Sequence, residues 1–299
     1  MHSEIKNVLT IDVEDYFHVA ALSKSINRED WGEISPRIKN NMFRLLELFD
    51  EKNVRATFFV LGWVAKRFPE IIREIDVRGN EVASHGYSHQ LIYTQSPEVF
   101  ENETRDSKNL LEDIIGKPVQ GYRAASYSIT RKSLWALDIL ADLGFKYDSS
   151  IFPVVHDNYG IRGSPEFPHV LRTPNKSTLV EFPLSTYRIL GQAIPVAGGG
   201  YFRLYPYWLS KFFYTRINQK AAPFVFYLHP WEIDPDQPRV DVNLLSRFRH
   251  YNNLDKGYPR ISRLLSDFRF TTMHEKLDEM ELFARGVPIT INYQDVTRF

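Results

Sequence analysis

Asn7-Val8-Leu9-Thr10-Ile11-Asp12 begins the part of the chain that decides the fold, and Val13-Glu14-Asp15 follows it directly. The apolar run is typical of a short buried β-strand, and carboxylates stand at and just beyond its end. Strands of this kind alternate along the chain with segments of helical periodicity, which predicts βαβ units and a mainly parallel sheet. Further strands are predicted at 55–60, 81–84, 120–124, 146–150, 179–182 and 223–229.

The predicted helices begin with recognisable capping residues. Ser35-Pro36 predicts a helix start, with Ser35 as the N-cap and Pro36 in the first turn. Ser96-Pro97 repeats this pattern, and the helix that it begins is expected to end at Gly116. Later helices are predicted at about 205–219 and 259–268.

The composition excludes several classes of protein. The chain has 299 residues, 43% of them hydrophobic, which is enough for a full core. Lys plus Arg and Asp plus Glu both number 37, so there is no basic excess of the kind that nucleic-acid binding needs. There is no Cys, so any metal must be held by His and carboxylates. No signal peptide and no apolar stretch of about 18 residues is found, which predicts a cytoplasmic protein without a transmembrane segment.

Two clusters of polar residues follow predicted strands and could bind a metal. Asp12, Glu14 and Asp15 would repel one another unless a cation or a proton holds them. His85 and His89 are four residues apart, so on a helical turn both imidazoles can reach one ion. The alternatives are a solvated acidic turn and two unrelated surface histidines. The carboxyl ends of parallel strands meet at one edge of a sheet, which favours a shared site.

Two more clusters lie at the ends of later strands. Arg123 could orient a carboxylate, although for an Arg taken alone a surface ion pair is the favoured interpretation. His229 could be a general acid or a satisfied core histidine, and Asp148 offers a carboxylate that could hold it.

Taken together and in this order, the clusters resemble the motifs of the polysaccharide deacetylases of carbohydrate esterase family 4, the NodB-homology domain. The resemblance covers roughly residues 5–232. It departs from the family pattern where Gly86 replaces Ser or Thr, where the third motif lacks its Pro and Tyr, and where the fourth lacks its Asp-Trp end. The stretches that carry it are Leu9 to Asp12, Ser84 to His89, Arg123 to Ser126, Asp148 to Ser150 and Tyr227 to His229.

The sequences of three stretches are similar to those of a subgroup of deacetylases found near exosortase and exopolysaccharide loci. This subgroup carries a C-terminal extension of unknown function. These stretches are Thr10 to Phe17, Gly198 to Arg203 and His229 to Asp234. The resemblance implies an α/β fold, an irregular parallel (β/α)7-type barrel, with a C-terminal extension. We expect the barrel over residues 1–235 and the extension over 236–299, packed on the barrel.

The resemblance also implies a metal centre. His85 and His89 would be ligands, and Asp12 would be the general base. The third ligand is open between Glu14 and Asp15. Alternation along a strand puts Glu14 on the side of Asp12, so Glu14 is favoured. The expected ion is Zn²⁺, and Co²⁺, Ni²⁺ or Fe²⁺ are also accepted by such ligand sets.

The remaining roles implied by the resemblance belong to catalysis and substrate binding. His229, held by Asp148, would be the general acid, and Arg123 would orient Asp12. A backbone N–H near 122–124 would stabilise the oxyanion. Tyr122, Leu228 and Trp231 would contact the substrate, with Leu228 in the pocket for the acetyl methyl group.

The implied function is metal-dependent removal of N-acetyl groups from an N-acetylated sugar polymer or its precursor. The substrate partner would be a carbohydrate, with no nucleic acid involved. Two alternatives stay open from the residues alone: an amidase acting on a small cyclic or linear amide, and a catalytically inactive carbohydrate-binding relative.

Overall fold

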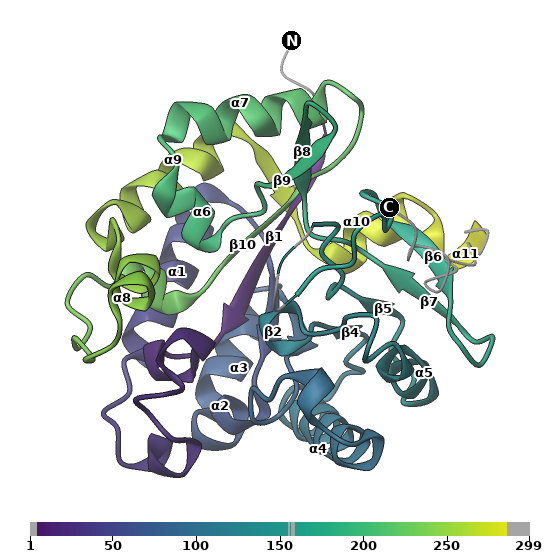
Figure 1. Ribbon diagram of the computed structural model, residues 1–299, viewed down its shortest axis with the longest axis horizontal. Helices are drawn as coiled ribbons and strands as arrows, with labels where there is room; N and C mark the ends of the chain where they lie inside the picture. Colours follow the sequence, from purple (N-terminus) through teal and green to yellow (C-terminus); the bar gives the residue numbers. More distant parts are fainter. Residues whose placement is uncertain (1–4, 155, 157–158, 286–299) are drawn as a thin grey trace.

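The structure is a computed structural model that describes residues 5–154, 156 and 159–285. It contains one large sheet in the strand order β10-β1-β2-β3-β4-β5-β7-β6, with β11 pairing on β1 (Figure 1). All pairs in it are parallel except β6 with β7. The strands are β1 (Lys6–Val13), β2 (Thr57–Val60), β3 (Glu81–Ser84), β4 (Gly121–Tyr122), β5 (Tyr147–Asp148), β6 (His169–Arg172), β7 (Thr178–Glu181), β10 (Val225–Leu228) and β11 (Arg269–Thr271).

This arrangement confirms the predicted mainly parallel α/β sheet, but the strand ladder does not close into a barrel. Within the described residues β10 is one edge and β6 the other. The free side of β10 is contacted by irregular backbone: the Tyr227 N–H donates to the Ala197 carbonyl at 2.7 Å. The hairpin β8 (Thr186–Ile189) and β9 (Gln192–Pro195) stands before this segment as a separate sheet.

The helices surround the sheet in Figure 1. They are α1 (Ile38–Lys52), α2 (Gly62–Arg67), α3 (Pro69–Val77), α4 (Pro97–Ile115), α5 (Trp135–Asp142), α6 (Gly199–Leu204), α7 (Tyr207–Asn218), α8 (Leu244–Tyr251), α9 (Gly257–Asp267), α10 (Met273–Glu279) and α11 (Leu282–Arg285). No helix in the described part of the chain is both long enough and apolar enough to cross a lipid bilayer.

Two helix starts show how the local predictions fared. Helix α4 has the predicted cap: the Ser96 hydroxyl accepts from the Val99 N–H, and Gly116 ends the helix at a φ of 67°. The prediction for α1 was wrong, because Arg37 rather than Ser35 is its N-cap. The cause is tertiary: the carboxylate of Asp15 accepts the N–H groups of Arg37 and Ile38, which fixes the start of the helix.

Strand alternation divides the core into two sides. Leu9, Ile11 and Val13 of β1 belong to the large cluster that packs against the helices. Thr10 and Asp12 point the opposite way, because successive side chains of a strand face opposite sides of the sheet. The inner side therefore receives the polar residues at the carboxyl ends of the strands.

Residues beyond 236 contribute to the same sheet. Strand β11 pairs with β1 in parallel, with Lys6 opposite Arg269. Helix α9 adds Ile261 and Leu264 to the main core. The boundary predicted at 235/236 stays a prediction, although this part of the chain shares both the sheet and the core with the first.

Candidate metal centre and active site

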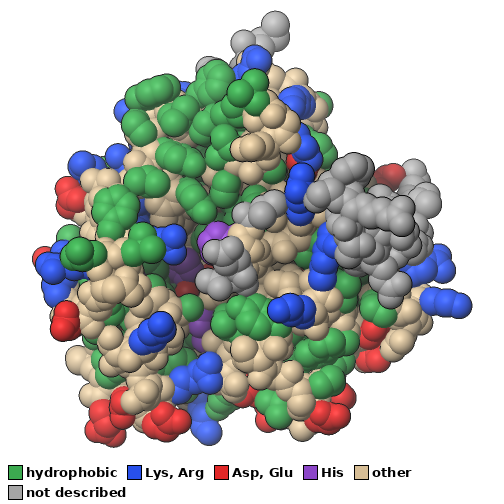
Figure 2. Space-filling view, viewed as in Figure 1, with side chains coloured by type: hydrophobic (Ala, Val, Ile, Leu, Met, Phe, Trp, Pro, Cys, Tyr) green, Lys and Arg blue, Asp and Glu red, His purple; other side chains and the backbone are tan. Residues whose placement is uncertain are grey.

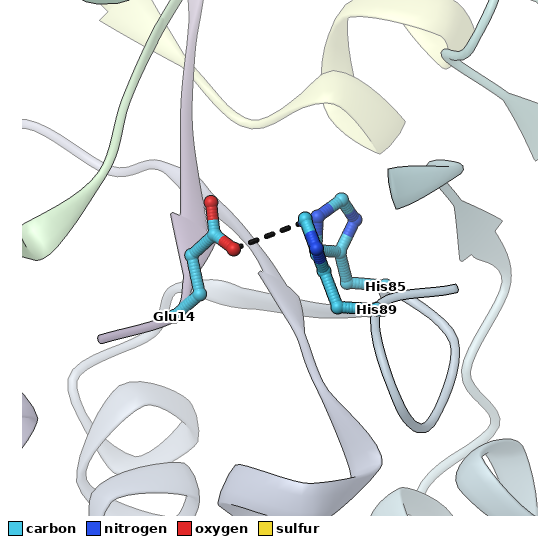
Figure 3. Close-up of side chains that lie close together, drawn as sticks. All are labelled: Glu14, His85 and His89. Atoms are coloured by element: carbon cyan, nitrogen blue, oxygen red, sulfur yellow. Dashed lines mark ion pairs between the residues drawn. The ribbon is translucent and has the colours of Figure 1, made fainter. Parts of the chain in front are cut away.

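Three side chains at the carboxyl ends of β1 and β3 converge on one point. Ligand atoms of Glu14, His85 and His89 all lie within 4.8 Å of one another, and the three residues are buried (Figure 3). Glu14 comes directly after β1, on the inner side. The two histidines come from the loop that follows β3.

That loop is not the helical turn that the spacing suggested. Residues 85–89 are irregular, with positive φ angles of 74° at Gly86 and 54° at His89. Its backbone is anchored, since the Gly86 carbonyl accepts the Gly62 N–H at 2.8 Å and the Ser107 hydroxyl at 2.9 Å. The two imidazoles are thus brought together by a turn of the loop, with ring centres 5.4 Å apart.

The orientation of His85 suits a metal ligand. Its Nδ1 lies 2.8 Å from the Arg123 carbonyl, which can only accept a hydrogen bond. Nδ1 must therefore donate to this carbonyl, and Nε2 is the ring nitrogen that remains available to a metal. Histidines that bind metals commonly donate their other ring N–H to a carbonyl or carboxylate in this way.

Glu14 provides the test of whether a cation fits here. Its Oε2 lies 3.0 Å from His89 Nε2, yet among the described residues this buried oxygen has no hydrogen-bond partner. Burial lowers the pKa of His89 to about 4, so this imidazole is neutral at pH 7. Burial would raise the pKa of Glu14, but the adjacent His89, His229 and His85 lower it well below its usual range. A buried carboxylate together with two imidazoles is a donor set that divalent transition metals favour.

Asp12 lies beside this group and is held by Arg123. The Arg123 Nη1 donates to Asp12 Oδ1 at 2.7 Å and to the Thr10 hydroxyl at 2.8 Å. The Arg123 Nε donates to the carbonyl of Ser149, and Nη2 donates to the hydroxyl of Ser149. Burial would lower the pKa of Arg123, but the charge of Asp12 raises it above its usual value. The contact expected between Arg123 and Asp12 is present, and it leaves Asp12 Oδ2 facing the site.

His229 reaches the same point from the end of β10. Its Nε2 lies 2.9 Å from Glu14 Oε1 and 4.0 Å from Asp12 Oδ2. Its side chain is 18% exposed, whereas those of Asp12 and Glu14 are 3% and 2% exposed, so it is the member nearest to solvent. Figure 2 shows histidine side chains at the bottom of a hollow in this face of the molecule.

The carboxylate that holds His229 is Glu232, and the pairing expected with Asp148 is corrected. The His229 Nδ1 lies 2.8 Å from Glu232 Oε1. Asp148 instead accepts from the Ser150 hydroxyl and shares a hydrogen bond with Glu181. Burial raises the pKa of both Asp148 and Glu181 above their usual values, and the two side chains are hydrogen-bonded to each other.

Asp15, the alternative third ligand, lies outside the group. Its carboxylate accepts the N–H of Tyr16 at 2.8 Å, of Arg37 at 2.6 Å and of Ile38 at 2.8 Å. Both oxygens are therefore occupied by the starts of two helical segments. The chain has already turned after Glu14, and this turn directs Asp15 toward α1.

Substrate contacts of Tyr122 and Leu228 stay a prediction, and the structure places both side chains in the core. Both are buried in the cluster that packs against the helices, and Tyr122 packs edge-on against Phe100 of α4. The physical reason is alternation: each precedes an inward-facing residue, Arg123 or His229, and so points outward.

Trp231 and the backbone N–H groups of Arg123 and Ala124 already have partners within the protein. Trp231 is 5% exposed and stacks between His229 and His250. The N–H of Arg123 donates to the Ser84 carbonyl, and that of Ala124 to the Ser150 hydroxyl. Neither is a free oxyanion donor in this structure.

A hollow of about 290 Å³ opens beside His89. It is formed mainly by residues 17–31, which follow β1 as short 3₁₀ turns, and its lining includes Phe17, His18, Trp31 and Leu91. No sequence pattern had indicated a role for this segment.

Comparison with known proteins identifies two matching parts of this chain. The sequence profile described as "Polysaccharide deacetylase" matches residues 30–147, and a profile described as a domain of unknown function, DUF3473, matches residues 149–278. Residues 30–147 therefore resemble the polysaccharide deacetylase family. The second match covers the part of the chain that supplies His229, Glu232 and α8.

Two relatives are similar to this chain over about a third of its length, and one solved structure shares its fold. A "Peptidoglycan deacetylase" of Helicobacter pylori is 33% identical over 108 residues, and a "Chitooligosaccharide deacetylase" of Rhizobium leguminosarum bv. trifolii is 31% identical over 98 residues. These matches cover 36% and 33% of this chain, and 36% and 43% of the relatives' own lengths. A crystal structure from Mycobacterium smegmatis, provisionally named a polysaccharide deacetylase, matches 98% of this chain and 96% of its own, with a TM-score of 0.59 at 20% identity. That structure shows the fold.

Proposed function

We propose that this protein is a metal-dependent hydrolase that removes N-acetyl groups from an N-acetylated sugar polymer or its precursor. The observation that carries the proposal is the meeting of Glu14, His85 and His89 beside both Asp12 and His229. The names of the relatives, peptidoglycan and chitooligosaccharide deacetylases, support the substrate class.

The metal site proposed here consists of Glu14, His85 and His89, with Zn²⁺ as the ion. A set of two histidines and one carboxylate leaves coordination positions open for substrate and water. When bound, such an ion polarises an acetyl carbonyl and lowers the pKa of water.

Asp12 is the proposed general base. Arg123 occupies Oδ1, so Oδ2 remains to take a proton from water as the oxygen attacks the acyl carbon. The attack breaks the amide C–N bond and yields acetate and a sugar amine.

His229 is the proposed general acid. An amine leaves poorly unless it is protonated, so a proton donor is needed at the leaving nitrogen. The His229 Nε2 faces the site while Nδ1 is held by Glu232, which directs the transferable proton to the substrate side.

The proposal is tested by measuring acetate release from N-acetylglucosamine oligomers by the zinc-loaded chain. We expect release, reduced by about 10²- to 10⁴-fold in Asp12→Asn, because a general base contributes this much. No acetate from any N-acetylated oligomer, with zinc bound, would refute the proposal. Turnover of ureides or small amides in its place would indicate an amidase.

A further inference from the structure

Glu232 fixes both the ring and the main chain of His229. Its Oε1 accepts the His229 backbone N–H at 3.1 Å and lies 2.8 Å from His229 Nδ1. The 3₁₀ turn Pro230–Ile233 brings Glu232 back over His229. One oxygen thus sets the orientation of the imidazole relative to its own backbone.

Arg203 holds the other oxygen of Glu232. Its Nε donates to Oε2 at 2.7 Å, and both side chains are 3% exposed. Burial would raise the pKa of Glu232, but the charge of Arg203 and the contact with His229 lower it to about 2. Glu232 is therefore a carboxylate at neutral pH, and an acceptor for the Nδ1–H of His229.

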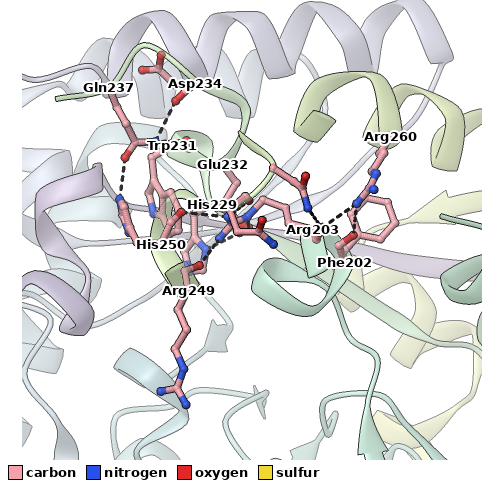
Figure 4. Close-up of polar contacts among 12 residues, drawn as sticks. Phe202, Arg203, His229, Trp231, Glu232, Asp234, Gln237, Arg249, His250 and Arg260 are labelled. Carbon is pink, nitrogen blue, oxygen red and sulfur yellow. Dashed lines mark hydrogen bonds and ion pairs between the residues drawn. The ribbon is translucent and has the colours of Figure 1, made fainter. Parts of the chain in front are cut away.

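The end of α8 holds Arg203 in turn. The Arg203 Nη1 donates to the carbonyls of His250 at 3.0 Å and Asn252 at 2.6 Å, and Nη2 to that of Arg249 at 3.1 Å (Figure 4). The last carbonyls of a helix lack partners within the helix and carry partial negative charge, so a guanidinium satisfies them well. The arginine thus joins the carboxyl end of α8 to Glu232.

A second contact links α8 to the same histidine. The ring of His250 stacks on Trp231 with centres 4.3 Å apart, and Trp231 stacks on His229 with centres 5.2 Å apart. His250 is fixed by Gln237, whose amide oxygen lies 2.7 Å from its Nε2. The ring of His229 is therefore confined on one face by stacking and at Nδ1 by Glu232.

We propose that Glu232, Arg203 and the end of α8 position His229 for proton transfer, so that residues 244–252 serve the active site without touching the substrate. This inference rests on the proposed function. It assigns a task to a part of the chain that lies within the match to DUF3473, whose function is unknown.

The purely structural alternative predicts a different outcome. If the network only stabilises the fold, its variants lose stability and leave kcat and the KM of the folded fraction unchanged. If it positions His229, the variants lower kcat, leave KM nearly constant and still bind zinc, because no member of the network is among Glu14, His85 and His89.

The test uses the full chain, zinc-loaded, with Glu232→Gln and Arg203→Lys. We expect kcat to fall by about 10- to 100-fold, as for loss of an orienting partner at other sites. KM should stay within about twofold, and zinc content should remain at the wild-type level. Glu232→Asp keeps the charge and should recover part of the loss.

Arg260→Lys is the matched control. Arg260 also donates to backbone carbonyls of this region, those of Phe202, Arg203 and Tyr205, but it does not contact Glu232. It should lose stability in the manner of Arg203→Lys while retaining kcat. Equal kcat in Arg203→Lys, Glu232→Gln and the wild type would overturn the proposal, and so would an equal loss of kcat in Arg260→Lys.

A measurement that does not depend on catalysis tests the positioning of His229 independently of the proposed deacetylase activity. In ¹⁵N spectra of the zinc-loaded wild type, His229 should show a protonated Nδ1, and its signals should change in Glu232→Gln and Arg203→Lys but not in Arg260→Lys. Unchanged signals in all three variants would contradict positioning. Absence of acetate release from the wild type, with these signals as expected, would instead refute the proposed function alone.

Discussion

The two sides of the site are built differently. On the side of β1 to β4, short runs of neighbouring residues supply Asp12, Glu14, His85, His89 and Arg123, and strand ends bring them together. On the side of β10, His229 depends on Arg203 and on backbone carbonyls from 249–252. The residues of the first side are positioned by the ends of adjacent parallel strands. The residues that hold His229 on the second side come from helices and turns outside the sheet, and contacts among these segments bring them together. Metal binding should therefore survive damage to the second side, whereas proton transfer should not.

The largest effects should separate metal binding from proton transfer. His229→Ala should lower kcat by about 10²- to 10⁴-fold, as expected for loss of a general acid, and should leave zinc bound. Zinc content by atomic absorption, measured beside acetate release, tests both halves. If His229→Ala also lost zinc, the two sides would not be separable as described.

The next effect distinguishes Glu14 from Asp15. Glu14→Gln removes the only charged ligand of the proposed set and should weaken zinc affinity by more than the roughly 10- to 100-fold caused by loss of an outer partner. Titration with a zinc-competing chelator measures this. Asp15→Asn is the matched variant one residue away, and it should keep the wild-type affinity. The reverse result would make Asp15 the ligand.

Asp15→Asn should act on stability instead. The carboxylate accepts three backbone N–H groups, and an amide cannot accept them at both of its ends. Loss of a helix cap costs about 0.5–2 kcal/mol. Urea unfolding of the variant should show a decrease of this size. A stability equal to the wild type would mean that the cap contributes little to holding α1.

The smallest effect concerns Leu228. Because its side chain packs toward the helices, Leu228→Met should cost less than about 1.5 kcal/mol and leave KM for the acetylated substrate unchanged. Steady-state kinetics with N-acetylglucosamine oligomers tests it. A clear rise in KM would indicate that Leu228 contacts the acetyl group after all.

Much of the first side could be predicted from the sequence. Apolar runs identified the strands, the carboxyl ends located the polar clusters, and alternation favoured Glu14 over Asp15 as the residue facing Asp12. The same alternation, applied to β4 and β10, would have placed Tyr122 and Leu228 outside the site, since each precedes an inward-facing residue.

The second side could not be predicted in the same way. Glu232 stands three residues after His229, and only the 3₁₀ turn between them makes the carboxylate face the ring. Arg203 lies in α6, and its carbonyl partners belong to the end of α8. Contacts of this kind depend on how helices pack around the sheet, for which the sequence carries no periodic signal. The Gly86 and His89 backbone angles that shape the loop are likewise a tertiary result.

The most direct test of the central claim is anomalous diffraction from crystals of the chain grown with zinc. We expect one strong peak at about 2.0–2.2 Å from a Glu14 carboxylate oxygen and from one ring nitrogen each of His85 and His89. We also expect Asp12 and His229 to lie beside the ion. A peak bound by Asp15, or one located away from both histidines, would contradict the account.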